Sequence, residues 1–251
     1  MAYTTIDNPE LYFQTKIYTA DQQANRAITL DGSENMQPDW IWFKNRTLAV
    51  THMVFDSVRG VTKYLATDQT TAEGTGSDHL ISFDTNGFTV DTSWNNYATG
   101  NGYAAWCWKA GTSFTNDASA TGIGSIDSTG SVNTDAGFSI ISYTGTGSNA
   151  TIAHGLGVTP DVIIAKSRAS VEGWGFFHSS FSSQEYMFLN TTSPKGSAST
   201  VWNALPGSAV FTVGSNGSVN ASGTMIAYCF AEKKGYSKFS SYTGNGNADG
   251  T

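Results

Sequence analysis

A nine-residue pattern that occurs twice constrains the fold of this chain more than any other feature. Residues 38–46 are Pro-Asp-Trp-Ile-Trp-Phe-Lys-Asn-Arg, and residues 160–168, which begin 122 positions later, are Pro-Asp-Val-Ile-Ile-Ala-Lys-Ser-Arg. In each copy a turn-forming Pro-Asp precedes an apolar run that ends in a basic residue, a small polar residue and an arginine. The pattern is typical of a buried strand that leaves a turn and emerges into solvent. Two copies indicate an internal duplication, which bears on every later assignment.

Other elements recur in the same order. Cys107 and Cys229 lie in equivalent apolar segments that are again 122 residues apart, and Phe-Thr-Val occurs at residues 88–90 and 211–213. We expect the two cysteines to be small buried side chains in separate cores and not a disulfide pair. Asn-Gly at residues 86–87, between two apolar runs, predicts a hairpin.

These repeats predict an all-β fold with two tandem β-sandwiches of jelly-roll or lectin-like type. Glycine (27 residues) and a low charged fraction (13%) fit a turn-rich β protein, and 13% aromatic residues supply its cores. We assign the repeats to residues 15–110 and 137–236. Residues 1–14 are expected to form an N-terminal arm or anchor with a short helix at Pro9 capped by Asn8.

The two remaining segments are predicted from composition and similarity. Residues 111–136 are rich in Gly, Ser and Thr and indicate a linker or surface excursion that could pack as an edge strand. Residues 237–251 are expected to start a third repeat or form a C-terminal tail, because Ser-Tyr-Thr-Gly at residues 241–244 repeats residues 142–145.

Charge and hydropathy exclude several classes of partner. The net charge is −7 and there is no run of Lys or Arg, so we expect no nucleic-acid partner. No apolar run approaches the length of a membrane span, and the first residues lack the pattern of a signal peptide. We therefore expect synthesis in a cytoplasm and no membrane insertion.

The residue types that carry catalysis are present without their usual spacing. The four histidines include no His-x-x-x-His pair, the two cysteines are far apart, and there is no Gly-x-Ser-x-Gly elbow. The carboxylates are scattered, and no pair is selected for glycoside hydrolysis. We expect a non-enzymatic protein with no catalytic residue, no metal ion and no cofactor.

Tryptophans are the remaining candidates for binding. Four of them alternate along two predicted strands of the first repeat, so that each strand presents a pair on one face. They are Trp40, Trp42, Trp106 and Trp108. Their counterparts in the second repeat are also apolar, which predicts core positions and not a sugar-stacking platform. The candidates for exposed glycan or receptor contacts are the aromatic residues near predicted loops, Trp94, Tyr97, Trp174 and Trp202.

Several stretches carry a resemblance to a known family. They are Gly-Phe-Ser-Ile-Ile-Ser-Tyr-Thr-Gly (137–145), Thr-Ile-Ala-His-Gly-Leu-Gly-Val-Thr-Pro-Asp-Val-Ile-Ile-Ala-Lys (151–166), Ala-Tyr-Cys-Phe-Ala-Glu-Lys-Lys-Gly-Tyr-Ser-Lys-Phe (227–239), and Tyr-Phe-Gln-Thr-Lys (12–16) leading to Gln-Pro-Asp-Trp (37–40). With them the chain resembles tail-fibre and virion structural proteins of marine tailed bacteriophages over nearly its whole length.

The resemblance implies a virion structural protein, assembled in the host cytoplasm, most often a tail fibre or fibre-like appendage that contributes to host attachment. It also implies a homo-oligomer, with a trimer favoured, and an arm that binds other tail or capsid proteins. It supplies no catalytic residues. Two alternatives stay open at this point: a capsid decoration or head-fibre protein, and a carbohydrate-binding module that binds a host surface glycan.

Overall fold

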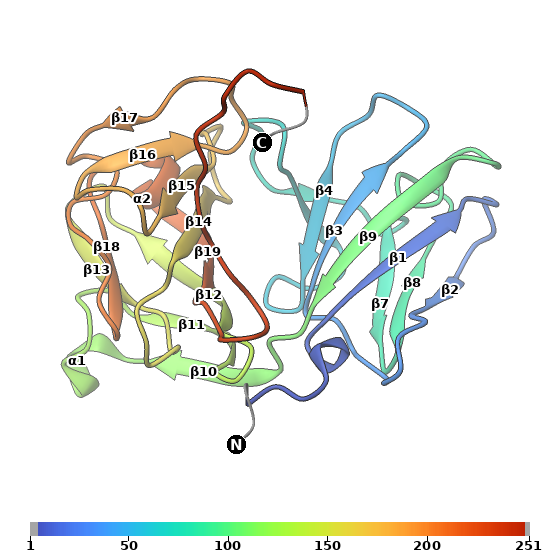
Figure 1. Ribbon diagram of the computed structural model, residues 1–251, viewed down its shortest axis with the longest axis horizontal. Coiled ribbons are helices and arrows are strands. Elements are labelled where there is room, and N and C mark those ends of the chain that lie inside the picture. The colour runs from blue at the N-terminus through green and yellow to red at the C-terminus, as the bar shows by residue number, and fades with distance from the viewer. Residues whose placement is uncertain (1–4, 249–251) are drawn as a thin grey trace.

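The computed structural model, which describes residues 5–248, is nearly all β and consists of antiparallel sheets (Figure 1). The expected all-β sandwich class is confirmed. Two short α-helices, α1 (Ala118–Thr121) and α2 (Gly217–Asn220), and one 3-10 helix, η1 (Pro9–Leu11), interrupt the strands of the described chain. As predicted, the side chain of Asn8 caps η1 by accepting a hydrogen bond from the Glu10 amide at 3.0 Å.

The N-terminal half contains a six-stranded and a three-stranded sheet. The large sheet has the order β1 (Phe13–Thr19), β9 (Gly102–Trp108), β3 (Trp40–Asn45), β4 (Met53–Asp56), β5 (Lys63–Ala66), β6 (Gly74–Thr75). The small sheet has the order β2 (Arg26–Thr29), β8 (Gly87–Val90), β7 (Leu80–Asp84). The predicted Asn-Gly hairpin joins β7 to β8, which pair from Asp84 and Gly87 outward.

The C-terminal half contains an eight-stranded and a two-stranded sheet. The large sheet has the order β10 (Thr112–Asn116), β11 (Ser128–Asn133), β12 (Phe138–Gly145), β19 (Gly223–Phe230), β14 (Val162–Ser167), β15 (Gly175–His178), β16 (Glu185–Phe188), β17 (Gly196–Ser197). The small sheet pairs β13 (Ala150–Ala153) with β18 (Val210–Val213).

Both large sheets contain the same sequence of pairings. The order β1-β9-β3-β4-β5-β6 in the N-terminal half matches β12-β19-β14-β15-β16-β17 in the C-terminal half, strand for strand along the chain. The duplicated Pro-Asp stretches form β3 and β14, which lie inside their sheets, as the buried apolar runs predict. The sequence repeat is therefore matched by a repeated strand order.

Of the two alternatives for residues 111–136, a free linker and an edge strand, the structure has the second. β10 and β11 extend the eight-stranded sheet through the pairing of β11 with β12, and β10 lies at its edge. Val132 is buried in the core of this half, and Phe114 and Ile126 pack against it. By contrast, residues 237–248 add no named strand, although a bridge joins Lys233 to Ser237.

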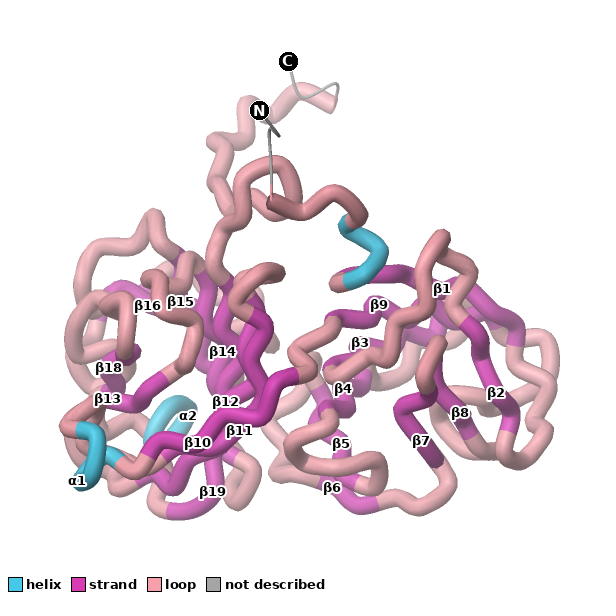
Figure 2. The backbone as a smooth tube through the Cα atoms, turned by 90° about the horizontal axis from the view of Figure 1, so that it is seen from below, coloured by secondary structure: helices cyan, strands magenta, loops and turns pink. Residues whose placement is uncertain are grey.

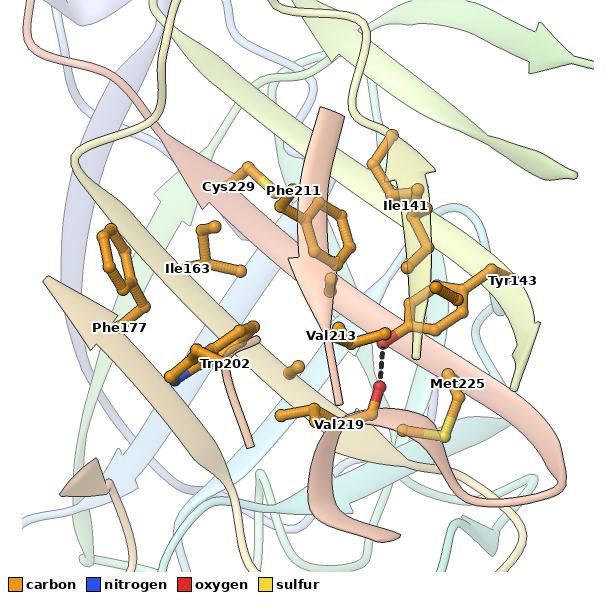
Figure 3. Packing of buried hydrophobic residues seen from close by; sticks show 14 of the residues in the cluster. Ile141, Tyr143, Ile163, Phe177, Trp202, Phe211, Val213, Val219, Met225 and Cys229 are labelled. Carbon is orange, nitrogen blue, oxygen red and sulfur yellow. Dashed lines mark hydrogen bonds between the residues drawn. The ribbon is translucent and has the colours of Figure 1, made fainter. Parts of the chain in front are cut away.

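Each half has its own core between its large and small sheets. In the N-terminal half, residues such as Ile41, Phe43 and Phe88 form this core. In the C-terminal half, Phe211 on β18 faces Ile141 and Cys229 of the large sheet (Figure 3). Both cysteines are free and buried, as expected.

A third core lies between the two large sheets and joins the halves. Its buried residues come from both sheets and include Trp40, Phe138, Tyr228 and Phe230. The ring centroids of Trp40 and Tyr228 are 4.7 Å apart in a stacked arrangement. The layers therefore run from small sheet to large sheet to large sheet to small sheet, with the two halves side by side (Figures 1 and 2).

This arrangement corrects the prediction for the four alternating tryptophans. They do not point into the core of their own sandwich, which contains Ile41 and Cys107 instead. They point toward the other half, where only Trp40 is fully buried (2% exposed). The others, Trp42, Trp106 and Trp108, remain partly exposed.

Buried charges also connect the halves. The Arg59 guanidinium contacts Asp56 (Nε–Oδ2, 2.5 Å) and Glu73 (Nη1–Oε2, 3.3 Å), and Glu73 in turn pairs with Arg168 of the C-terminal half at 2.7 Å. The hydroxyl of Tyr228, also from the C-terminal half, donates to Asp56 at 2.7 Å. The relative position of the two large sheets is thus fixed by directional contacts as well as by apolar packing.

Candidate glycan-binding site

Two of the four predicted contact residues are buried. Trp174 is 1% exposed, and its Nε1 donates to the carbonyl of Ala66 at 2.8 Å and to that of Gln69 at 3.2 Å. Trp202 is 2% exposed, and its Nε1 donates to the carbonyl of Phe176 at 3.2 Å. The prediction that these two tryptophans contact a glycan is therefore wrong: loops that looked exposed fold back over a sheet and satisfy the indole N–H inside the protein.

The other two predicted residues, Trp94 and Tyr97, are exposed and line one pocket. Their exposed fractions are 40% and 53%. The pocket has a volume of about 270 Å³ and is lined by Asn45, Val50, Ser93, Trp94, Tyr97 and Tyr103. It lies where the loop between β8 and β9 passes the end of β3.

The Tyr103 hydroxyl holds this loop in place. It donates to the carbonyl of Trp94 at 2.7 Å and accepts from the amide of Tyr97 at 3.2 Å. Asn101 Nδ2 adds a hydrogen bond to the carbonyl of Tyr97 at 3.2 Å. Because the backbone of the two exposed aromatic residues is fixed in this way, their rings are presented with little loss of freedom on binding.

A buried asparagine lines the pocket. Asn45 is 3% exposed, and its Oδ1 accepts from the amides of Thr47 and Leu48, both at 2.8 Å. Its Nδ2 is buried from solvent. Burial raises the pKa of Tyr103, and a hydrogen bond with the Asn45 side chain opposes that shift. Asn45 therefore supports the end of β3 and the Tyr103 hydroxyl beside the pocket.

Sequence reasoning did not identify Asn45. The second copy of the repeat has serine at the equivalent position 167, and nothing in the sequence marks an asparagine at a strand end as a pocket residue. The available signal was its place at the end of β3, two residues after the last apolar side chain, where a strand emerges at the surface.

Two of the four histidines, His79 and His154, are buried. His154 is 0% exposed; its Nε2 lies 3.1 Å from the carbonyl of Gly207, and its Nδ1 accepts from the amide of Leu156 at 3.2 Å. Burial lowers the pKa of His154 and also that of His79. Within residues 5–248 no group of three or more His, Cys, Asp or Glu is placed to hold a metal ion.

Lys166 is the buried cation of the C-terminal half. Burial lowers its pKa to about 8, with Glu172 opposing the shift. Its Nζ donates to the carbonyl oxygens of Ser167 at 2.8 Å and Ser170 at 3.3 Å. Because the side chain is 0% exposed, it stabilises the loop after β14 and presents no reactive amine to solvent.

Comparisons with known proteins give a family without an assigned activity. Residues 5–248 contain no helix long and apolar enough to cross a membrane. No curated protein and no solved structure matches the chain. The model of one family matches residues 8–251, and the chain therefore belongs to the family defined by a domain of unknown function, DUF7483.

Proposed function

We propose that this protein is a non-enzymatic structural protein of a tailed-phage virion, a tail fibre or fibre-like appendage that contributes to host attachment by binding a surface glycan. The resemblance of its repeats to virion structural proteins supports the first part. The observation that carries the second part is the pocket that the exposed side chains of Trp94 and Tyr97 line together with Ser93.

The pocket fits sugar chemistry. A pyranose ring has an apolar face of C–H groups that packs on an exposed indole or phenol ring, and hydroxyls at its edge that pair with polar groups. Trp94 and Tyr97 supply the rings, and Ser93 supplies a hydroxyl. Small-molecule sites generally combine apolar walls with a few polar groups in this way.

The remaining parts of the proposal concern assembly. The arm that carries η1 is the segment proposed to bind other tail or capsid proteins, and a trimer is the expected oligomer. Light scattering of the purified protein tests the oligomer, and a monomer would count against a fibre. Mass spectrometry and cryo-electron microscopy of purified particles test the location. Density on the capsid would identify a decoration protein, and absence from particles would overturn the virion role.

The glycan part is tested on an array of neutral and acidic oligosaccharides. Trp94→Ala and Tyr97→Ala are each expected to weaken binding at least tenfold, which corresponds to about 1.4 kcal/mol. The matched control is Tyr242→Ala, because Tyr242 is 94% exposed and lies outside the pocket. Unchanged binding by both pocket variants would refute the site.

A further inference from the structure

We propose that a groove lined by Trp42, Trp106 and Trp108 is a second saccharide site, continuous with the Trp94 pocket, and that the two together bind a neutral hexopyranose chain. The inference rests on the proposed glycan-binding function and names its ligand class. It assigns a role to side chains that the sequence predicts to be core.

Strand register places these tryptophans on one face. In the pairing of β3 with β9, Trp42 is opposite Trp106 and Trp40 is opposite Trp108. Side chains two residues apart share a face of a strand, so Lys44 and Ala104, the next opposed pair, lie on the same face. The ring centroids of Trp42 and Trp106 are 6.5 Å apart.

The C-terminal half covers only part of this face. It buries Trp40 and Val54 in the core between the large sheets. Beyond them the face is open and forms a groove of about 410 Å³, lined by Trp42, Lys44, His52, Trp106 and Trp108. This volume lies within the range of roughly 300–1,000 Å³ that small-molecule sites occupy.

Two residues on this face are smaller than their counterparts in the other half. At the positions equivalent to His52 and Ala104, the C-terminal half has Trp174 and Ile226, each 122 residues later. Trp174 and Ile226 are 1% and 0% exposed and belong to the core between the sheets. At these two positions the C-terminal half therefore has larger, buried side chains where the N-terminal half borders the groove.

A third hollow connects the two sites. It has a volume of about 550 Å³ and is lined by Lys44, Ala49, Val50, Thr51, His52, Asp68, Gln69 and Trp94. It shares Lys44 and His52 with the tryptophan groove, and Val50 and Trp94 with the first pocket. The aromatic surfaces of Trp106 and Trp94 thus lie along one channel, as an extended chain of sugars requires.

The polar groups between the aromatic ends indicate an uncharged ligand. Lys44 has no carboxylate within 4.0 Å in the described chain, and its Nζ has one long contact, 3.4 Å to the carbonyl of Val50. Asp68 lies in the same hollow and accepts from the amide of His52 at 3.2 Å. The hollow therefore offers one cation (Lys44), one anion (Asp68) and one amide (Gln69). This mixture suits sugar hydroxyls, which both donate and accept hydrogen bonds, better than it suits a polyanion.

The test uses two kinds of variant that leave the buried core residues in place. Ala104→Ile and His52→Trp fill the groove with the side chains that the C-terminal half has at these positions. Trp106→Ala removes an aromatic surface on which a sugar would stack. The matched control is Ile17→Ala, because Ile17 pairs with Ala104 from β1 and is 62% exposed. Circular dichroism and thermal melting verify that each variant folds.

Calorimetry and tryptophan fluorescence are measured with neutral gluco-, galacto- and manno-configured mono- and tetrasaccharides and with tetragalacturonate. The groove variants are expected to weaken binding of a neutral tetrasaccharide at least tenfold and to leave monosaccharide binding unchanged within twofold. Ile17→Ala is expected to change neither the tetrasaccharide affinity nor the monosaccharide affinity. Equal tetrasaccharide binding by wild type and groove variants would overturn the second site while leaving the Trp94 site standing.

Two other outcomes test the neutral charge of the ligand and the proposed glycan binding itself. Tetragalacturonate bound more than tenfold more tightly than every neutral tetrasaccharide would overturn the assignment of a neutral ligand. Absence of binding to any of these probes would overturn the groove and the glycan part of the proposed function together. The virion role is judged separately, by the presence of the protein in purified particles.

Discussion

Arg59 offers the sharpest test of how the two halves are held together. Its side chain and that of Asp56 are both fully buried, and their ion pair measures 2.5 Å. Arg59 also donates to the carbonyl of Val54 at 3.1 Å and lies 3.3 Å from the Tyr228 hydroxyl. Arg59→Met keeps an unbranched apolar stem but removes the guanidinium and leaves the Asp56 carboxylate buried without its cation.

Removing one partner of a buried ion pair costs about 3–5 kcal/mol of the free energy of unfolding. Asp56 retains two donors in the variant, the Tyr228 hydroxyl at 2.7 Å and the backbone amide of residue 59 at 2.8 Å. Glu73 retains Arg168. These contacts place the expected loss at the lower end, about 3 kcal/mol. For a chain of this size that is roughly 6–12 °C in melting temperature.

Urea denaturation monitored by tryptophan fluorescence measures the loss. Arg168→Met is the matched control, because Arg168 pairs with the same Glu73 but its side chain is 18% exposed, and its loss is expected to be about 1 kcal/mol. Adding Asp56→Asn to Arg59→Met should recover at least half of the loss, because the cost comes from the unpaired charge. A loss below about 1 kcal/mol for Arg59→Met, or no recovery in the double variant, would refute this reasoning.

Three further predictions concern buried side chains. Trp174→Phe removes the hydrogen bonds from the indole to the N-terminal half and should lower the free energy of unfolding by about 1–2 kcal/mol. The loss would be measured as a lower midpoint of urea denaturation, and an unchanged midpoint would contradict the role given to Trp174. Burial raises the pKa of Cys229 to about 12 and also raises the pKa of Cys107. Neither thiol should therefore react with a disulfide reagent until denaturant is added. Reaction of the native protein within minutes would show that the reagent can enter the cores. Burial lowers the pKa of His154, so the unfolded state binds more protons, and stability should be complete above the unfolded pKa of about 6.5 and fall as the pH is lowered through it. His154→Gln, which retains a donor for Gly207, should make melting temperature less dependent on pH between about 7.5 and 5.5, whereas an equal dependence would exclude His154 as a contributor.

Local signals predicted the fold well because each depends on a few neighbouring residues. The duplicated Pro-Asp strand, the Asn-Gly hairpin between β7 and β8 and the Asn8 cap of η1 are all present. The alternation along β3 also separated two faces correctly. It could not say that one face is covered by the small sheet of the same half and the other in part by the opposite large sheet.

The wrong predictions concern positions whose burial depends on tertiary packing. Trp174 and Trp202 lie near segments that the sequence predicts to be loops, and only the tertiary fold shows that their indoles are covered. For residues 111–136 the sequence left a linker and an edge strand open, and the pairing of β10, β11 and β12 decides for the strand. The Trp94 and Tyr97 pair was found because exposed aromatic residues in a short loop depend less on distant packing.

Lys44 and Lys166 show that packing, more than local sequence, determines where an open site exists. They occupy the same position of the duplicated stretch, and the loops that follow them to His52 and Trp174 have equal length. The loop after Lys166 is held against the N-terminal half, because the Glu172 amide donates to Thr70 and the Glu73 amide donates to Arg168, both at 2.9 Å.

No such contact with the other half closes the loop after Lys44 within the described chain, and its side chain lies in the channel between the aromatic sites. The same lysine is therefore a buried structural cation in one half and an available donor in the other. Because the C-terminal half closes its own channel against its neighbour, binding is expected from the N-terminal half alone. One saccharide chain bound per polypeptide is the stoichiometry that follows, and calorimetry with a neutral tetrasaccharide measures it directly.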